Sequence, residues 1–259
     1  MLLSLLRSIA GRHSSRKPNC VVNGIPMRLD FRESIQKCMA KGVYDPDQTG
    51  WVKRHLREGS VFIDIGASFG YYTSLAWSLV GRRGRVFSFE PSPHAYSTLK
   101  HNLRGYKFRN ITLVNAAVGR GVGEITIYMP PAAGLHSPSA FVSHEEYPPL
   151  RVPLTSLDEF APIASLDQID MVKMDVEGSE PDVLKGMSGL IGRGKVKRII
   201  CEFNSWWLNA NNTTVESLHS TFLQMGFEIE DQTTLQKNLP AIRDEVFDLQ
   251  DFLYKYVGH

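Results

Sequence analysis

The sequence predicts one α/β domain with a mostly parallel sheet and helices on both of its faces. The first observation behind this prediction is a regular alternation of short β-rich runs with helix-like segments. The second is the length of 259 residues, which allows a large core without disulfide bonds. The third is the composition, 42% hydrophobic and 22% charged residues, which is typical of globular proteins rather than disordered ones.

The expected elements form two series with the same strand and helix pattern. Runs of β-branched and aromatic residues indicate the strands, and apolar periodicity closed by glycine indicates the helices. In the first series, strands are expected at 61–66, 85–90 and 111–118, with helices at 71–80 and 93–103. In the second series, strands are expected at 169–175, 196–203, 227–231 and 246–256, with helices at 180–190 and 214–225.

Two segments depart from this pattern. Residues 1–41 are expected to form an N-terminal extension or cap on a main domain at 42–259, and their first residues favour a packed or frayed helix over a membrane-surface helix. Residues 119–153 are expected to form an edge hairpin around a long loop at 130–149. Loops of that length inside a compact domain are usually functional or disordered, so a substrate lid is favoured.

Charge and cysteine content limit the partners and the compartment. The formal net charge of +2 is too small to argue for a nucleic-acid partner. No stretch approaches the roughly 18 apolar residues of a membrane-spanning helix. The three cysteines show no Cys-x-x-Cys spacing, which argues against a disulfide framework or structural zinc. A cytoplasmic location is therefore expected.

Polar residues follow one expected strand after another. In an open parallel sheet the ligand lies beyond the carboxyl ends of the strands, so residues at these ends are the informative ones. Any one of them is equally well explained as a solvated strand end, whereas the whole series favours a binding site. The series comprises Asp64 with Gly66 and Gly70, Glu90, Asn115 with Ala116, Asp175 with Glu177, and Glu202 with Asn204.

The glycines after the first strand indicate which ligand lies there. A glycine in this place allows a tight turn and close approach of a ligand to the backbone. The spacing of Gly66 and Gly70 does not fit a dinucleotide fingerprint, and the carboxylate of Asp64 would repel a phosphate. Glu90 is placed to accept hydrogen bonds from ribose hydroxyls. S-adenosylmethionine, which has a ribose, an ammonium and a sulfonium but no phosphate, meets these constraints.

Several motifs in a fixed order resemble the FkbM family of S-adenosylmethionine-dependent methyltransferases. They are VFIDIGASFGYYTSLAW, GRVFSFEPSPHAYSTLKHNL, VNAAVG, VPLTSLDEF, IDMVKMDVEGSEPDVLKG and IICEF, and the resemblance runs from about Gly42 to Glu202. It implies the class I methyltransferase fold, a Rossmann-like seven-stranded sheet with the order 3-2-1-4-5-7-6 and an antiparallel seventh strand. It also implies methyl transfer, typically to a hydroxyl oxygen. Ser68 departs from the family, which often has asparagine there, and its hydroxyl can still form a hydrogen bond.

The resemblance also implies which residues bind the cofactor. Glu90 would bind the ribose, and Asp175 would face the reactive end of the cofactor or the acceptor. Tyr44 would cover the sulfonium with its ring, and an ordinary half-buried tyrosine is an equal alternative. The full expected set is Tyr44, Asp64, Gly66, Ala67, Ser68, Gly70, Glu90, Asn115, Ala116 and Asp175, with Asn115 and Ala116 beside the adenine.

Transfer to an alcohol also needs a group that takes the hydroxyl proton. Asp175 and Glu202 are the first candidates because each closes a central strand, and His136 in the long loop and His94 come next. An alternative for Glu202 is to orient the acceptor together with Asn204. No metal is expected, because no spaced ligand set indicates one, although paired carboxylates can hold a divalent cation.

Two further pairs have structural alternatives. Glu177 and Glu180 either belong to the site or stabilise the start of the following helix, and for Glu180 the second role is preferred. Trp206 and Trp207 follow the fifth strand, where one is expected to wall the acceptor site and the other to pack in the core.

The leading hypothesis is an S-adenosylmethionine-dependent O-methyltransferase that acts on a hydroxyl of a small molecule or glycan. A second hypothesis is a non-catalytic scaffold that keeps the fold and binds the cofactor. A third, a nicotinamide-dependent oxidoreductase, is disfavoured by the glycine spacing. No nucleic-acid acceptor is expected, because no Asp-Pro-Pro-Tyr-like tetrapeptide follows the fourth strand.

Overall fold

The computed structural model describes residues 18–31, 34–42, 44–104, 110–128, 148–233, 236–240 and 246–258. The apolar run at the N-terminus, His136 and nearly all of the loop at 130–149 lie outside these residues. The terminal helix, the substrate lid and the role of His136 therefore stay predictions.

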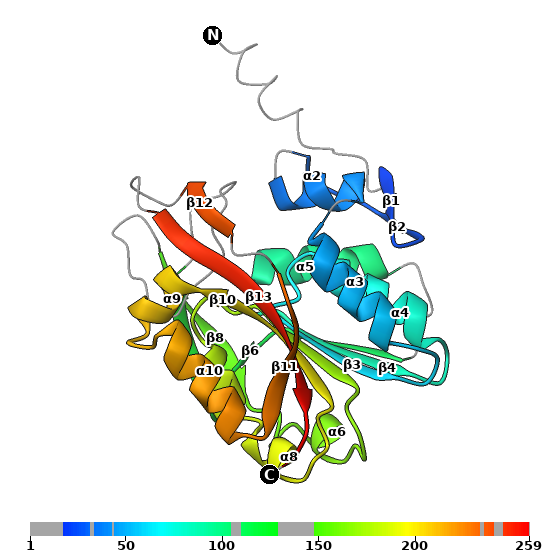
Figure 1. Cartoon of the computed structure of the whole chain (residues 1–259). Helices are drawn as coiled ribbons and strands as arrows, with labels where there is room; N and C mark the ends of the chain where they lie inside the picture. Colours follow the sequence, from blue (N-terminus) through cyan, green and yellow to red (C-terminus); the bar gives the residue numbers. More distant parts are fainter. Residues whose placement is uncertain are drawn as a thin grey trace.

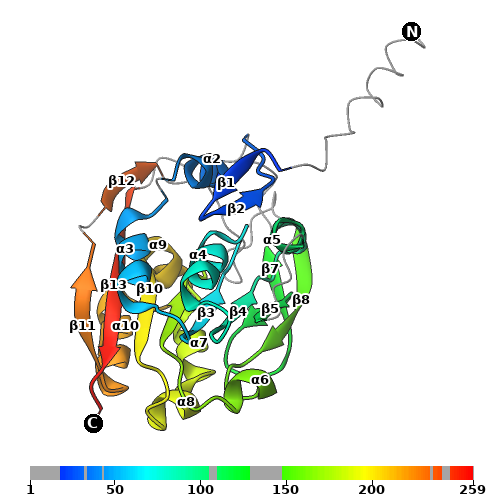
Figure 2. The same cartoon turned by 90° about the vertical axis from the view of Figure 1, so that its right-hand side faces the viewer.

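The centre of the molecule is a twisted sheet with the strand order β11-β13-β10-β9-β3-β4-β5 (Figures 1 and 2). Its strands are β3 (Val61–Ile65), β4 (Arg85–Phe89), β5 (Ile111–Val114), β9 (Met171–Met174), β10 (Arg198–Asn204), β11 (Phe227–Gln232) and β13 (Val246–Tyr256). Strand β13 runs antiparallel to both neighbours, and the pairs among β10, β9, β3, β4 and β5 are parallel. This confirms the expected class I fold, and the path has the expected order. The short β12 (Gln236–Pro240), which pairs with β13, was not expected.

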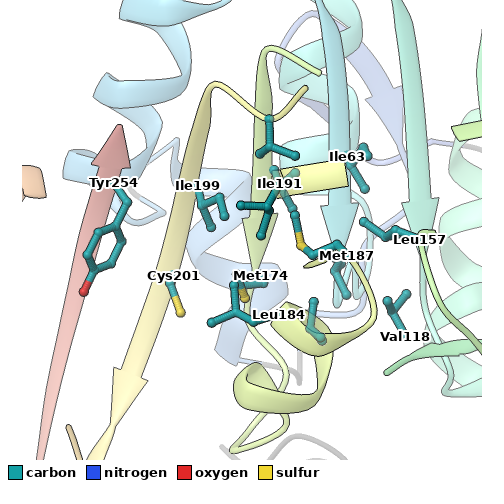
Figure 3. Packing of buried hydrophobic residues seen from close by; sticks show 14 of the residues in the cluster. Ile63, Val118, Leu157, Met174, Leu184, Met187, Ile191, Ile199, Cys201 and Tyr254 are labelled. Atoms are coloured by element: carbon teal, nitrogen blue, oxygen red, sulfur yellow. The ribbon is translucent and has the colours of Figure 1, made fainter. Parts of the chain in front are cut away.

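Helices cover both faces of the sheet. The α3/α4 face is covered by α3 (Pro46–His55), α4 (Tyr71–Val80) and α5 (Pro93–Leu103). The α7/α10 face is covered by α6 (Ala161–Ala164), α7 (Glu180–Lys185), α8 (Ser188–Gly192), α9 (Ser205–Ala210) and α10 (Val215–Gln224). Successive side chains of a strand point to opposite faces of the sheet, so Phe62 packs on the α3/α4 face while Ile63 packs on the α7/α10 face. Figure 3 shows part of the α7/α10 core, where Met174 and Ile199 gather with Leu184.

The helix starts follow from local sequence. Ser92 precedes α5, and its hydroxyl accepts a hydrogen bond from the Ala95 N–H at 3.3 Å. Thr214 caps α10 in the same way, accepting from the Ser217 N–H at 3.2 Å. Such caps satisfy N–H groups that have no partner within the helix. A proline in the first turn of α5 fits the same helix start.

The single helix expected at 180–190 is wrong, because the chain breaks between α7 and α8. Gly186 lies at the break, and a β-carbon added to it would stand 1.8 Å from the Gly119 carbonyl oxygen. The backbone of residue 119 thus occupies the space that a side chain would need. Gly119 is far from Gly186 in the sequence, so local sequence patterns do not reveal this close approach.

The residues expected as one strand at 111–118 belong to two sheets. After β5 the chain passes into β6 (Ala117–Val118), which joins β7 (Gly123–Tyr128) and β8 (Pro149–Thr155) in a three-stranded sheet with the order β6-β8-β7. Strands β7 and β8 pair antiparallel, as a hairpin does. They belong to this separate sheet and do not extend the edge of the main sheet. The expected pairing is therefore confirmed, and its expected place at the edge of the main sheet is wrong.

The N-terminal region packs on the α3/α4 face. It contains β1 (Cys20–Val22), β2 (Ile25–Met27) and α2 (Ser34–Lys41), with β1 and β2 paired antiparallel. Met27 is fully buried in the same apolar cluster as Leu75 and Leu99 of the main domain. Within the described residues, no helix combines the length and apolar character needed to cross a membrane.

Gly186→Ala is expected to lower the free energy of unfolding by at least about 2 kcal/mol, because the new methyl group collides with backbone that has no room to move. Urea unfolding followed by circular dichroism measures this. The control is Gly192→Ala, where a β-carbon meets nothing within 4 Å. A loss in the control as large as in Gly186→Ala would contradict the steric explanation.

Candidate active site at the carboxyl ends of the central strands

The glycine turn after β3 is fixed by its neighbours on two sides. Gly66 has φ +79°, and a β-carbon there would stand 2.0 Å from the Asp175 carbonyl oxygen at the end of β9. Gly70 has φ +96°, and its β-carbon would stand 2.5 Å from Leu99 Cδ1 on α5. The positive φ favours glycine at both positions, and at Gly66 the Asp175 backbone also leaves no space for a side chain. Ala67, between them, is buried.

Glu90 joins the turn after β3 to the turn after β4. The residue is 4% exposed, and its two oxygens accept hydrogen bonds from the Ser68 and Ser92 N–H groups, each at 2.8 Å. Ser68 thus uses its backbone, with φ +49°, in this contact. Burial raises the pKa of Glu90 to about 7 against the opposing effect of these two N–H groups. Each carboxylate oxygen has a further lone pair for a ligand hydroxyl.

Asn115 and Ala116 lie where the chain leaves the main sheet. The Asn115 side-chain amide donates to the Glu90 carbonyl at 2.7 Å and to the Pro91 carbonyl at 3.1 Å. Asn115 therefore fixes the backbone that carries Glu90. Ala116 is buried beside it, at 4% exposure. Contact of either residue with the adenine stays a prediction.

Asp64 is buried between β3, β4 and α4. Its Oδ2 accepts a hydrogen bond from the Thr73 hydroxyl at 2.7 Å, and that hydroxyl lies 2.8 Å from the Ser88 hydroxyl. Its Oδ1 has no hydrogen-bond partner in the part of the chain that the structure describes. Burial raises the pKa of Asp64, while the charge of Lys173 acts in the opposite direction. The structure thus places this carboxylate beneath the α4 helix, and direct contact with a cofactor stays a prediction.

Lys173 is a buried charged residue beside the candidate site that the sequence analysis missed. It lies in β9 opposite Asp64 of β3, and its side chain is 4% exposed. Its Nζ lies 3.0 Å from Asp175 Oδ2 and 5.1 Å from the centre of the Tyr72 ring. Burial alone would lower the pKa of Lys173, but the charges of Asp175 and Asp64 outweigh it and raise the pKa. A lysine inside the apolar run of β9 was the available signal.

The structure brings the two first candidates for catalysis together with Glu177. Asp175 and Glu177 follow β9 and Glu202 lies in β10, and one oxygen from each lies within 4.8 Å of the other two. Burial and the charges of Asp175 and Glu177 raise the pKa of Glu202 well above its ordinary value. These three side chains, which we call the carboxylate triad, are able to hold a cation. The sequence alone indicated no such set.

Tyr44 borders the carboxylate triad from the segment before α3. Its ring packs edge-on against Tyr71, with 4.9 Å between the centroids, and lies 6.0 Å from the Tyr72 ring. Burial, and then the charges of Asp45 and Asp175, raise the pKa of Tyr44 well above its ordinary value. The phenol therefore stays protonated and is a hydrogen-bond donor near neutral pH.

The remaining candidates have mainly structural surroundings. Trp207 is buried, and Trp206 lies partly exposed against it, with 4.4 Å between ring centroids. The Asn204 side chain caps α9 by accepting from the Trp206 and Trp207 N–H groups at 3.1 and 3.4 Å. His94 is exposed on α5. Glu180 accepts from the N–H groups of residues 176 and 178 at 3.3 and 3.4 Å, so it holds the turn before α7, and the preferred role of stabilising the helix start stays a prediction.

A family model of the methyltransferase FkbM domain matches residues 64–229, more than half of the chain. The protein belongs to the FkbM methyltransferase family. This confirms the expected family and its cofactor, S-adenosylmethionine. The carboxylates of the site fit that cofactor. Glu90 offers acceptors for two hydroxyls, and the buried Asp64 keeps one oxygen without a partner among the described residues. Both carboxylates suit a cationic ligand without phosphate.

This chain is similar to curated methyltransferases over part of their length. The 2-O-methyltransferase NoeI of Sinorhizobium fredii is 24% identical over 166 residues, which cover 57% of this chain and 67% of that protein. The hexuronic acid methyltransferase AglP of Haloferax volcanii is 28% identical over 136 residues, 52% of either chain. The aligned regions span 27% to 67% of the curated relatives' own lengths.

The chain is also similar to a solved structure, that of methyltransferase FkbM from Methylobacillus flagellatus KT. The match has a TM-score of 0.49 and 18% identity, and it covers 84% of this chain and 52% of that chain.

Glu90→Gln is expected to weaken S-adenosylmethionine binding about tenfold or more. An amide in place of the carboxylate turns an N–H toward the backbone N–H of Ser68 or Ser92, so an acceptor is lost in the buried turn. Isothermal titration calorimetry at pH 7.5 measures the dissociation constant. The exposed Glu58, paired with Arg83 at 3.2 Å, supplies the control Glu58→Gln, which should bind as the wild type does. Unchanged affinity in Glu90→Gln would remove Glu90 from the cofactor site.

Glu180→Gln is expected to raise the free energy of unfolding by about 1 to 3 kcal/mol at pH 7.5 and to leave it nearly unchanged at pH 4.5. Burial raises the pKa of Glu180 from 4.5 to about 7, so the folded protein holds a proton that the unfolded chain releases between these values. The wild type therefore loses stability as the pH rises through this window. Urea unfolding at the two pH values checks the sign. An equal effect of Glu180→Gln on the free energy of unfolding at both pH values would contradict the raised pKa of Glu180.

Proposed function

We propose that this FkbM methyltransferase transfers a methyl group to a hydroxyl oxygen of a small molecule or sugar. The observation that carries the proposal is the pairing of Asp175 and Glu202 at the carboxyl ends of β9 and β10, next to the glycine turn. Carboxylates in this place serve an acceptor that must lose a proton. The names of two relatives, a 2-O-methyltransferase and a hexuronic acid methyltransferase, support the same acceptor class.

Bound S-adenosylmethionine supplies a methyl group on a sulfonium, and its transfer forms one O–C bond and breaks one S–C bond, whose electron pair stays on sulfur. In this proposal Glu202 takes the hydroxyl proton. Glu202 lies near the end of β10, the edge of the sheet where the acceptor is expected. Asp175, held by Lys173 at 3.0 Å, positions the acceptor hydroxyl instead. The protonated Tyr44 phenol donates to an oxygen at the same end of the site.

The charge of the acceptor end disfavours a nucleic-acid acceptor. Asp45 and Asp251 add further carboxyl groups near the carboxylate triad, close enough for the charge of Asp175 to raise the pKa of each. Lys173 offsets part of this negative charge. A polyphosphate backbone would be repelled, whereas a neutral acceptor rich in hydroxyls finds hydrogen-bond acceptors. We therefore keep small molecules and glycans as the proposed acceptor class.

Glu202→Gln is expected to lower kcat for methyl transfer about 10²-fold or more while leaving the dissociation constant of S-adenosylmethionine unchanged. The assay follows labelled methyl transfer from S-adenosylmethionine to a panel of sugars and small alcohols, with products identified by mass spectrometry. The control is Asp182→Asn, which removes a surface ion pair with Arg120 at 2.8 Å. A wild-type kcat in Glu202→Gln would refute the role of this residue. Saturable cofactor binding without transfer to any hydroxyl would favour the non-catalytic scaffold.

A further inference from the structure

The N-terminal region, residues 1–41, differs in charge from the rest of the chain. It contains eight Lys and Arg against two Asp and Glu, a formal charge of +6, so residues 42–259 carry −4. The value of +2 for the whole chain hides this division. The first acidic residue of the chain is Asp30. A basic segment attached to an acidic domain is typical of proteins that bind a polyanion or an anionic membrane surface.

The first residues of this region combine basic side chains with apolar ones in a helical spacing. Residues 1–17 lie outside the described part of the chain, so this pattern is a property of the sequence. Arg7 falls on the side of the expected helix opposite its apolar side, and Arg12, Arg16 and Lys17 follow. One short apolar run gives only marginal membrane binding, and stable binding needs a second signal. The apolar side comprises Leu2, Leu5, Leu6 and Ile9.

The described part of the N-terminal region presents apolar and basic side chains on its outer surface. Strand β1 turns Val22 into the core and leaves Val21 64% exposed, because successive residues of a strand point to opposite faces. Phe31, which follows β2, is 45% exposed. In α2, Lys37 and Lys41 are exposed one turn apart. Both views place β1, β2 and α2 together at one end of the molecule (Figures 1 and 2).

We propose that residues 1–41 bind the surface of a membrane that contains anionic lipids. The apolar side of segment 1–10 enters the boundary between headgroups and acyl chains, where Val21 and Phe31 also make contact, and the basic side chains lie among the lipid phosphates. A nucleic acid is disfavoured as the partner, because it would pair with the cations and leave the exposed apolar side chains in water. The charge of −4 on residues 42–259 disfavours contact of the main domain with the same lipids.

Flotation of the full-length protein with lipid vesicles tests this proposal without cofactor or methyl acceptor. We expect binding to phosphatidylcholine vesicles with about 30% phosphatidylserine to be at least about tenfold tighter than to pure phosphatidylcholine vesicles. The double variant Arg12→Glu with Arg16→Glu should weaken this binding at least about tenfold. The matched control is Arg57→Glu with Arg82→Glu, the same charge change at two exposed residues of the main domain, which should bind as the wild type does.

Two apolar double variants separate contact with the acyl chains from charge attraction alone. One is Leu6→Ser with Ile9→Ser, and the other is Val21→Ser with Phe31→Ser. Each should lower the affinity for the anionic vesicles at least about threefold, because the apolar side chains lose their burial in the lipid. Circular dichroism and an unchanged dissociation constant of S-adenosylmethionine show that each variant is folded.

Three outcomes would overturn the proposal. One is the lack of flotation with the anionic vesicles at about 0.1 M salt, where charge attraction is only partly screened. Another is an equal loss of binding in Arg12→Glu with Arg16→Glu and in the matched control, which makes the effect one of overall charge. The third is wild-type affinity in both apolar double variants, and tighter binding of a DNA duplex than of the vesicles would then identify a nucleic acid as the partner.

Discussion

Within the sheet, the ammonium of Lys173 lies between carboxylates on neighbouring strands, in a region that water hardly reaches. It stands opposite Asp64 of β3 and 3.0 Å from Asp175 at the end of its own strand. A buried charge is tolerated only with a partner of opposite sign, and removing one partner leaves the other uncompensated. The charge of Lys173 thus couples β3 to the end of β9, where the Asp175 backbone also packs against Gly66 of the glycine turn.

The alternation of side chains along the strands keeps this charge away from the apolar core. Asp64, Lys173, Glu202 and Asp251 share the α3/α4 face because paired positions in neighbouring strands point the same way. The opposite face carries a continuous apolar cluster under α7 and α10, part of which is seen in Figure 3. The α3/α4 face has an apolar cluster of its own, which includes Phe62 and Leu99, and it also accepts polar groups near the ends of the strands. The two requirements do not compete for the same positions.

The sequence predicted what depends on local pattern. Strand and helix positions, the glycine turn and the series of strand-end carboxylates follow from residue types over a few positions, and the sheet order came from the family resemblance. What it missed depends on contacts between distant segments. The lack of room for a side chain at Gly186 comes from the backbone of Gly119, and the partner of Asp251 is known only once β13 is paired in register with β10. Lys173 was overlooked because a single charge in a strand becomes informative only with its neighbours.

The distribution of carboxylates also bears on how methyl transfer is accelerated. A carboxylate beside a sulfonium stabilises the charged reactant more than the transition state, in which that charge is dispersing, so it slows transfer unless it is compensated. Glu90 avoids this conflict because it lies at the end of β4, where the ribose is expected, and its oxygens already face two N–H groups. Asp175 avoids the same conflict because the ammonium of Lys173 compensates its charge. Glu202 has to be ionised to take the hydroxyl proton, so in the proposed reaction its charge acts on the acceptor rather than on the sulfonium.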